Sequence, residues 1–282
     1  MTSVEGLLLV DKPRGVTSHD VVDVVRRGLG TRKVGHAGTL DPMATGLLLI
    51  GVGRATRLLR FLGGLPKIYE GTLRLGVETT TLDADGDVVR ETEVDVPEAD
   101  VGAAMRALVG ESLQRPPAYS AVKVGGRKLY EAARGGEHLE AEPRPIRVDA
   151  FDLLSFATPD ASFRVTCSGG TYVRVLAADV GAALSCGAHL TALRRTAIGP
   201  YVVDDAVAPD GAGDPLPIDR AVGHLPRLDL DPEEAVAASH GRPLGPSGLT
   251  GPYAVFGPDG RLIGVYEDEG PRARPQVILA SG

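Results

Sequence analysis

Apolar runs separated by polar, glycine-rich turns divide the first part of the chain into short strands and helices. The runs at 6–10 and 47–52 have the length and composition of buried strands. Between them, residues 17–27 carry valines at helical spacing, with Thr and Ser placed to cap the start and glycines just past the end. We expect a loop over 31–45 and a short helix over 55–62, which a glycine pair closes.

The pattern continues with strands and helices in irregular alternation. We expect strands or extended segments at 67–76, 87–93, 144–156, 162–168, 190–198 and 200–203, and helices at 97–109, 128–134 and 171–184. The regular strand–helix–strand order of a parallel sheet is missing from this series. The pattern therefore predicts an α+β fold, with a mixed, largely antiparallel sheet and flanking helices.

The composition and the predicted secondary structure of the chain change near residue 227. At 282 residues it is long for one domain, and two domains are the natural expectation. Beyond 227, Pro and Gly become dense, the stretch 253–266 predicts a hairpin across Pro-Asp-Gly, and 276–279 reads as a last strand. We therefore predict a large domain at 1–226 and a small β-rich domain at 227–282.

Composition narrows the class of protein further. With 43% apolar and 24% charged residues, the chain resembles an ordinary soluble protein with a sizeable core. It has no 18-residue apolar run, and the apolar patch at 7–10 is too short for a signal peptide. Cys167 and Cys186 have neither metal-ligand spacing nor enough partners for a disulfide framework. We expect no membrane association, no metal, and a cytoplasmic location.

The distribution of charge says more than its total. A net charge of −7 argues against nucleic acid, but the excess of acidic over basic residues is confined to two segments. Segments 1–75 and 101–200 carry +5 and +3, whereas 76–100 and 201–282 carry −8 and −7. Because the local field steers a polyanion, the basic segments are compatible with nucleic-acid binding. The alternative is that these clusters are only solvated faces.

The stretch VGHAGTLDPMATGLLLIGVG, residues 34–53, holds the best catalytic candidate, Asp41. A residue before proline is held in an extended conformation, which would present this carboxylate from a turn next to a strand. The surrounding glycines leave room for a substrate to approach the backbone. The competing interpretation is an aspartate that only caps a turn.

Other chemistries fit this stretch poorly. The glycine pattern lacks the spacing of a nucleotide phosphate loop, and 51–54 is only half a dinucleotide fingerprint. The acidic turn TTTLDADG at 79–86 lacks the full calcium-loop pattern. His36 and Asp41 together could suggest a hydrolase, but no nucleophile motif accompanies them.

Two further side chains could complete a site around Asp41. Tyr69, in KIYEG, lies on a predicted strand beside a lysine and could stack on a base, although it could equally be a core tyrosine. Arg174, in SGGTYVRV, lies near a helix start and could pair with a carboxylate and lower its pKa. The alternative for Arg174 is a surface arginine.

Together these segments resemble the bacterial tRNA pseudouridine-55 synthase family. The resemblance rests on LLLVDKPRGVTS, GHAGTLDPMATGLL, KIYEG, TTTLDADG, PPAYSAVKVGGRKLYEAAR, CSGGTYVRVLAADVG and CGAHLTALRR, which follow in order over residues 5 to 200. It implies isomerisation of a T-loop uridine to pseudouridine, with tRNA as partner and no cofactor. The C-terminal part resembles a reduced RNA-binding PUA-like module, and we expect a monomer with no obligate protein partner.

The resemblance also assigns roles to individual residues. It implies that Asp41 is catalytic, either by attacking the ribose or by removing its C2′ proton. Tyr69 would stack on the target base and take part in removing the C5 proton, and Arg174 would pair with the aspartate. The other implied site residues are His36, Tyr172 and Leu193 in the nucleotide pocket and Asp83 in a supporting role. The basic insertion at about 115–147 would clasp the RNA.

Two other functions compete with this prediction. The basic insertion and the C-terminal module would also suit a protein that binds or refolds RNA without essential chemistry. Asp41 discriminates between the two, since a pure binder has no need for a carboxylate facing a polyanion. A hydrolase built on His36 and Asp41 is the third hypothesis, and it predicts cleaved RNA or a product of altered mass.

Overall fold

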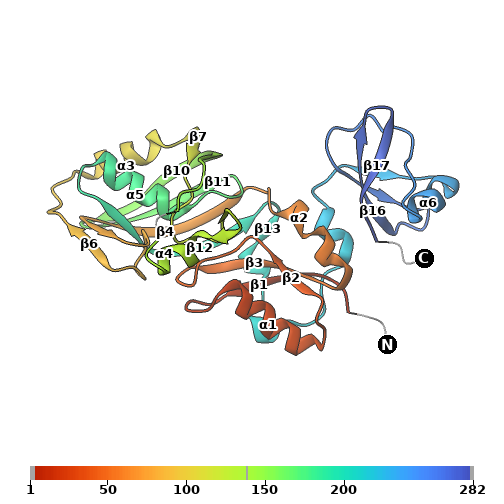
Figure 1. Ribbon diagram of the computed structural model, residues 1–282, viewed down its shortest axis with the longest axis horizontal. Coiled ribbons are helices and arrows are strands. Elements are labelled where there is room, and N and C mark those ends of the chain that lie inside the picture. Colours follow the sequence, from red (N-terminus) through yellow and green to blue (C-terminus); the bar gives the residue numbers. More distant parts are fainter. Residues whose placement is uncertain (1–3, 138, 280–282) are drawn as a thin grey trace.

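The computed structural model describes residues 4–137 and 139–279 and has an elongated shape built around two sheets (Figure 1). The larger sheet has nine strands in the order β1-β3-β12-β4-β11-β10-β7, with β2 added to β3 and β13 to β12. These strands are β1 (Gly6–Lys12), β2 (Val34–Ala37), β3 (Thr45–Val52), β4 (Lys67–Leu75), β7 (Gly110–Gln114), β10 (Arg144–Ala157), β11 (Asp160–Cys167), β12 (Ala188–Ile198) and β13 (Tyr201–Val202).

The predicted α+β class and mixed sheet are confirmed. The strand pairs of the larger sheet are antiparallel, except for the parallel pair β12–β3, where Arg194 and Arg195 face Thr45 and Gly46. This parallel contact joins the two halves of the sheet directly beside Asp41. The site therefore lies where the N-terminal part of the sheet meets its centre.

Helices cover the larger sheet from several sides. Helix α1 (Ser18–Leu29) packs its valines against β1, β2 and β3, and α3 (Glu98–Ala107) and α5 (Val173–Ala183) cover the apolar cluster around β4, β10, β11 and β12. The 3-10 helix η1 (Gly53–Leu58) leads into α2 (Leu59–Leu62). As predicted, α1 begins after a threonine cap, where Thr17 and Asp20 form a capping box, and it ends at Gly30, whose φ is 61°.

Two small excursions leave the sheet near Asp41. Strands β5 (Val77–Thr79) and β6 (Val88–Glu91) carry the acidic turn between them. The basic insertion contains the hairpin β8 (Lys123–Val124) and β9 (Arg127–Lys128), followed by α4 (Leu129–Arg134). Its predicted end at 147 was too late, because 144–148 pairs with β7 as part of the larger sheet.

The prediction of a loop over 31–45 was wrong for residues 34–37. Residues Val34–Ala37 form β2, which pairs with the end of β3 in register Val34 to Val52 and Ala37 to Leu49. The glycines in this stretch suggested a loop, but a four-residue strand forms here because β3 offers an edge for pairing. Consequently His36 lies on a strand and not in a loop.

The C-terminal part forms a separate four-stranded sheet, β14 (Arg227–Asp229), β15 (Tyr253–Phe256), β16 (Leu262–Glu269) and β17 (Arg272–Ile278). The predicted hairpin is present as β15 and β16. Helix α6 (Pro232–Ser239), capped by Asp231, was not predicted. Three short 3-10 helices, η2 (Val203–Asp205), η3 (Pro209–Gly211) and η4 (Ile218–Val222), occupy the connection between the two sheets.

The two sheets are held together by apolar and polar contacts. Phe256 and Val277 of the small sheet belong to the same apolar cluster as Leu58 and Leu62 of the segment η1–α2. Arginines on that segment also donate hydrogen bonds to backbone carbonyls at the end of the chain, namely Arg54 to Leu279, Arg57 to Ile278 and Arg60 to Gln276.

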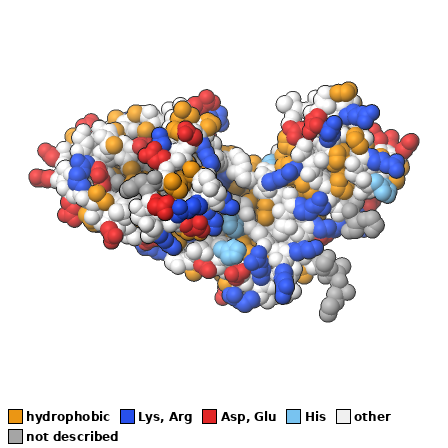
Figure 2. Space-filling view, in the orientation of Figure 1, with side chains coloured by type: hydrophobic (Ala, Val, Ile, Leu, Met, Phe, Trp, Pro, Cys, Tyr) orange, Lys and Arg blue, Asp and Glu red, His pale blue; other side chains and the backbone are white. Residues whose placement is uncertain are grey.

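Charged side chains are unevenly spread over the surface. Figure 2 shows Lys and Arg side chains concentrated across the middle of one face, over the region of α1 and α2, while Asp and Glu side chains gather toward the two ends. This agrees with the basic and acidic segments read from the sequence. In the described part of the chain, no helix is long and apolar enough to cross a membrane.

Candidate active site

Asp41 lies in the turn between β2 and β3, and backbone contacts fix that turn. The Pro42 carbonyl accepts hydrogen bonds from the Gly15 amide at 2.8 Å and from Lys12 Nζ at 3.4 Å. The Ala44 amide donates to the Asp41 carbonyl at 3.1 Å. The carboxylate is therefore presented by a rigid turn that is tied to β1 and to the residues after it.

Arg174, on the first turn of α5, is the partner of Asp41. Its Nε lies 2.9 Å from Asp41 Oδ2, and its Nη2 lies 3.4 Å from Oδ1. The Nε contact is a contact between charges and not an aligned hydrogen bond. Two backbone carbonyls, those of Thr81 and Tyr119, accept hydrogen bonds from Nη1 and Nη2 at 3.0 and 2.9 Å. The arginine is thus held from both sides while it faces the aspartate.

The two partners differ in exposure. The Arg174 side chain is 3% exposed, whereas that of Asp41 is 37% exposed because it opens into a cavity below the protein surface. Burial raises the pKa of Asp41, and the charge of Arg174 opposes this shift. Arg174 therefore favours the ionised carboxylate, although burial still leaves the pKa of Asp41 above its ordinary value.

Two adjoining cavities meet at Asp41. An inner cavity of about 260 Å³ and an outer one of about 890 Å³ share Asp41 and Arg174 in their walls, together with the segment 120–121 of the basic insertion. The inner cavity also contains Tyr69, Tyr172 and Leu193. A group placed in either cavity can reach the carboxylate.

Tyr69, Tyr172 and Leu193 come from three different elements. Tyr69 on β4 and Leu193 on β12 are 6% and 8% exposed and belong to neighbouring antiparallel strands. Tyr172 precedes α5 and exchanges two hydrogen bonds with the Gln114 side chain, through its amide at 2.8 Å and its carbonyl at 3.2 Å. These side chains give the inner cavity two aromatic groups and one apolar wall.

His36 and Asp83 lie toward the outer cavity. Burial lowers the pKa of His36, and its Nδ1 has no hydrogen-bond partner among the residues that the structure describes. Asp83 is 4% exposed and accepts hydrogen bonds from the Thr81 hydroxyl and the Asp85 amide. Its Oδ2 lies 3.8 Å from Arg174 Nε, so the arginine faces two carboxylates. All seven predicted residues therefore lie on one of the two cavities.

Two buried cations of the inner cavity, Lys67 and Arg195, were not predicted as site residues. Lys67 was noted only as the cation beside Tyr69. Arg195 carried no signal, because an arginine in LTALRR reads as an ordinary surface residue. Only the pairing of β12 with β3 and β4 brings it next to Tyr69.

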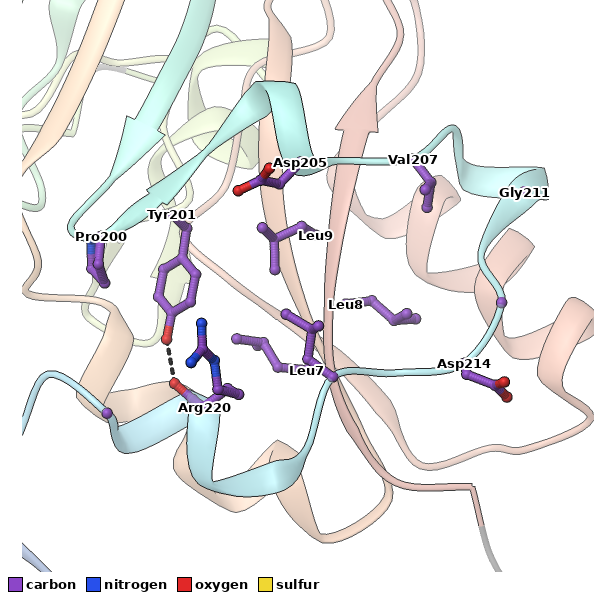
Figure 3. Close-up of a pocket in the computed structure, with 13 residues that line it drawn as sticks. Leu7, Leu8, Leu9, Pro200, Tyr201, Asp205, Val207, Gly211, Asp214 and Arg220 are labelled. Carbon is purple, nitrogen blue, oxygen red and sulfur yellow. Dashed lines mark hydrogen bonds between the residues drawn. The ribbon is translucent and has the colours of Figure 1, made fainter.

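A third cavity lies away from Asp41, along the outer edge of β1 (Figure 3). It measures about 680 Å³ and is lined by leucines of β1, by Tyr201 and Arg220, and by the carboxylates Asp205 and Asp214. Of the described residues that line it, none belongs to the predicted site. The predicted chemistry is therefore concentrated at the two cavities around Asp41.

Comparison with known families agrees with this geometry. Residues 26–173 match the model described as "TruB family pseudouridylate synthase (N terminal domain)". The chain belongs to the TruB family of pseudouridylate synthases. Residues 174–209 match "tRNA pseudouridylate synthase B C-terminal domain", and residues 225–280 match "tRNA Pseudouridine synthase II, C terminal". The predicted family and isomerase activity are confirmed, and the chain is a pseudouridine synthase of the class that acts on tRNA.

Close relatives span nearly the whole chain. It is 46% identical over 284 residues to "tRNA pseudouridine synthase B" of Mycobacterium sp. (strain KMS), which covers 97% of this chain and 96% of the relative. It is 48% identical over 289 residues to the protein of the same name from Thermobifida fusca (strain YX), covering 98% and 99%.

A solved structure extends the similarity to a more distant relative. A chain in "Crystal Structure of a Cbf5-Nop10-Gar1 Complex" superposes with a TM-score of 0.76 at 27% identity, covering 97% of this chain and 84% of the other. The α+β fold with its C-terminal module is thus shared beyond close sequence relatives.

Proposed function

We propose that this chain isomerises uridine 55 in the T-loop of tRNA to pseudouridine, with Asp41 acting on a nucleotide flipped out of the loop. The observation that carries the proposal is the ion pair of Asp41 with the buried Arg174, at the junction of two cavities. A carboxylate facing a polyanion is unfavourable unless it has a chemical task. The compensating guanidinium keeps this carboxylate ionised, as an attacking group or a base must be.

The inner cavity suits a single flipped base. Extracting a base from a stem-loop costs a few kcal/mol. Stacking on the aromatic ring of Tyr69 would return about 1–3 kcal/mol of that cost. Tyr172 and Leu193 would hold the nucleotide from other sides, and His36 would shape the entrance from the outer cavity.

The reaction exchanges a C–N bond for a C–C bond on the same base, so it needs no redox partner. Asp41 either attacks C1′ of the ribose or removes the C2′ proton. Tyr69 is the residue that we assign to the later loss of the C5 proton, since it would lie against the base. Asp83 supports the site through Arg174, which it approaches to 3.8 Å.

The remainder of the RNA would lie across the basic surface. We assign the clasping of the T-arm to the basic insertion that carries α4, and additional RNA contacts to the PUA-like module beginning at residue 227. Phosphate contacts from these cations would make binding salt-dependent. Acting on tRNA places the enzyme in the cytoplasm, where we expect it to work as a monomer.

The test measures release of tritium from C5-labelled uridine in a T-arm stem-loop RNA. The wild-type chain should release label, and Asp41→Asn should abolish release while folding and RNA affinity stay close to wild type. Normal turnover by Asp41→Asn would overturn the role of Asp41, whereas RNA binding without tritium release by the wild-type chain would favour an RNA-binding role. Unchanged RNA mass together with carbodiimide-reactive pseudouridine would exclude a hydrolase.

A further inference from the structure

Two buried cations without an anionic partner lie on the wall of the inner cavity. Lys67 is 4% exposed and Arg195 is 1% exposed. Lys67 Nζ donates to the carbonyls of Gly63 and Leu65, both at 2.9 Å. Arg195 donates from Nε to the Leu47 carbonyl at 2.7 Å and from Nη2 to the Gly38 carbonyl at 3.0 Å. Within the described parts of the chain, neither forms an ion pair.

This arrangement is unusual for buried charges, which are normally paired. Carbonyl oxygens solvate a cation but do not cancel its charge. Burial, and next the charge of Arg195, lower the pKa of Lys67 to about 8, so most of the Lys67 side chains are still protonated near neutrality. Asp41, by contrast, already has Arg174 as its counter-charge. The end of the cavity at Lys67 and Arg195 therefore carries positive charge that an anionic group of the substrate could neutralise.

The two cations flank the place where a base would stack. Lys67 and Tyr69 are two residues apart on β4, so they share one face of the sheet. Arg195 pairs opposite Tyr69 on β12, and its Cζ lies 6.0 Å from the centre of the tyrosine ring. A Cβ added to Gly38 would lie 3.5 Å from Lys67 Cε and 3.6 Å from Arg195 Nη1, so both side chains border the same glycine.

We infer that Lys67, together with Arg195, stabilises the uracil anion that leaves the ribose during the reaction. The inference rests on the proposed function. Breaking the C1′–N1 bond sends its electron pair to N1, whether Asp41 has attacked C1′ or has removed the C2′ proton. The negative charge spreads over N1, O2 and O4 of the free base. The base then turns and C5 bonds to C1′. This step either breaks the bond between C1′ and the Asp41 carboxylate, or returns the proton from Asp41 to C2′. The C5 proton is then lost, and N1 gains a proton.

The chemistry of Lys67 suits this task. An ammonium has three donors, and its two carbonyl bonds leave one N–H for an oxygen of the base. Because the backbone and the sheet fix both cations in advance, they need little reorganisation when charge develops on the base. A preorganised donor of this kind lowers the barrier to bond cleavage more than it strengthens substrate binding.

The test compares two substrates in single-turnover reactions. One T-arm RNA carries uridine at the target position and the other carries 5-fluorouridine, whose base is a more stable anion. Consumption of the target nucleoside is measured after complete nuclease digestion. For Lys67→Met we expect roughly a hundredfold slower reaction with uridine. The loss with 5-fluorouridine should be clearly smaller, because that base depends less on external stabilisation. Lys67→Arg, which keeps the charge, should recover part of the uridine rate.

Lys12→Met is the matched control. Lys12 is also a fully buried lysine bonded to backbone carbonyls, those of Pro13, Val16 and Pro42, but it is not among the described residues that line the inner cavity. Its loss should slow both substrates by a similar factor. Melting temperatures and RNA affinity are measured for all variants.

Three results would overturn the inference. Equal slowing of both substrates by Lys67→Met would assign the lysine a structural role. Weaker RNA binding with an unchanged single-turnover rate would identify it as a phosphate ligand. An unchanged rate on uridine would remove it from the chemistry. Failure of the proposed function is a different result, since the wild-type chain would then convert neither RNA.

Discussion

The guanidinium of Arg174 lies against the carboxylate of Asp41, with Nε 2.9 Å from Oδ2, across 133 residues of sequence. The arginine is buried and anchored by backbone carbonyls, whereas the aspartate opens into the cavity. The pair thus has a fixed side, Arg174, and a reacting side, Asp41. This division makes the protonation of Asp41 depend on a residue that need not touch the base.

Replacing Arg174 should change activity and its pH dependence together. Burial raises the pKa of Asp41 and Arg174 lowers it. Arg174→Met removes the opposing charge, so the pKa should rise further and the acidic limb of the rate profile should move to higher pH. Because Asp41 is partly exposed, loss of the pair should cost less than the roughly 3–5 kcal/mol typical of a fully buried pair, but the variant should still be less stable. Tritium release measured across pH checks the shift.

Arg164→Met supplies the control for that experiment. Arg164 pairs with Glu70 on the exposed side of the sheet and is 56% exposed. Its loss should leave both rate and pH profile unchanged, because exposed pairs contribute little. If Arg174→Met retained the wild-type acidic limb, the guanidinium would not be what keeps Asp41 ionised.

Asp41→Asn should change how stability varies with pH. The folded-state pKa of Asp41 lies above the unfolded value, so the native state holds this proton more tightly. This tighter binding of the proton stabilises the native state at pH values below the ordinary aspartate pKa of about 3.9. The stabilisation is lost as the pH rises through the raised pKa of the folded state. Asparagine does not titrate, so the free energy of unfolding of the variant does not fall with pH for this reason. Its melting temperature relative to wild type should therefore increase from acidic to neutral pH, and a constant difference would contradict the assignment.

Much of this architecture could be predicted because local signals agreed with the final fold. The helix after Thr17 has its cap, its valine stripe and its terminal glycine within one short segment, so its ends could be placed from sequence. The same holds for the antiparallel pair β10 and β11. By contrast, β2 exists only because β3 offers an edge for pairing, and no local pattern marks it.

The same distinction, between residues marked by local sequence patterns and residues that depend on tertiary structure, applies to the site. Asp41 could be nominated from its own neighbours, namely glycines and a following proline. Tyr69 and Arg174 became specific only when the ordered motifs were considered together. Lys67 and Arg195 were not predicted as site residues, because their role depends on burial, and the sequence does not distinguish a buried cation from an exposed one. Their positions follow from pairing of β4 and β12, which are more than a hundred residues apart.

Gly46 should be irreplaceable beside the Asp41 turn. Its φ is +102°, and a Cβ there would lie 2.3 Å from the carbonyl oxygen of Arg195. Gly46→Ala therefore has to strain the backbone and push β3 away from β12, which should lower both melting temperature and turnover. Gly28→Ala in α1 is the matched control, since open space surrounds that position. It should stabilise the chain by roughly 0.5–1 kcal/mol, and similar melting shifts in the two variants would contradict this account.

The arginines of η1 and α2 should control how firmly the C-terminal sheet is docked. Arg57 and Arg60 donate to the carbonyls of Ile278 and Gln276 at the outer edge of the small sheet. Each such bond contributes about 0.5–1.5 kcal/mol when it forms. Arg60 also donates to Oε1 of the Gln276 side chain at 3.0 Å. Without these three bonds the edge is held by Arg54 and by apolar contacts. The double variant Arg57→Ala and Arg60→Ala should therefore speed hydrogen exchange in β17 while the amides of β4 and β12 keep their protection.

Arg27→Ala on α1 serves as the control for loss of a surface cation. Unchanged exchange in β17 would mean that Arg54 and the apolar packing around Phe256 are sufficient for docking.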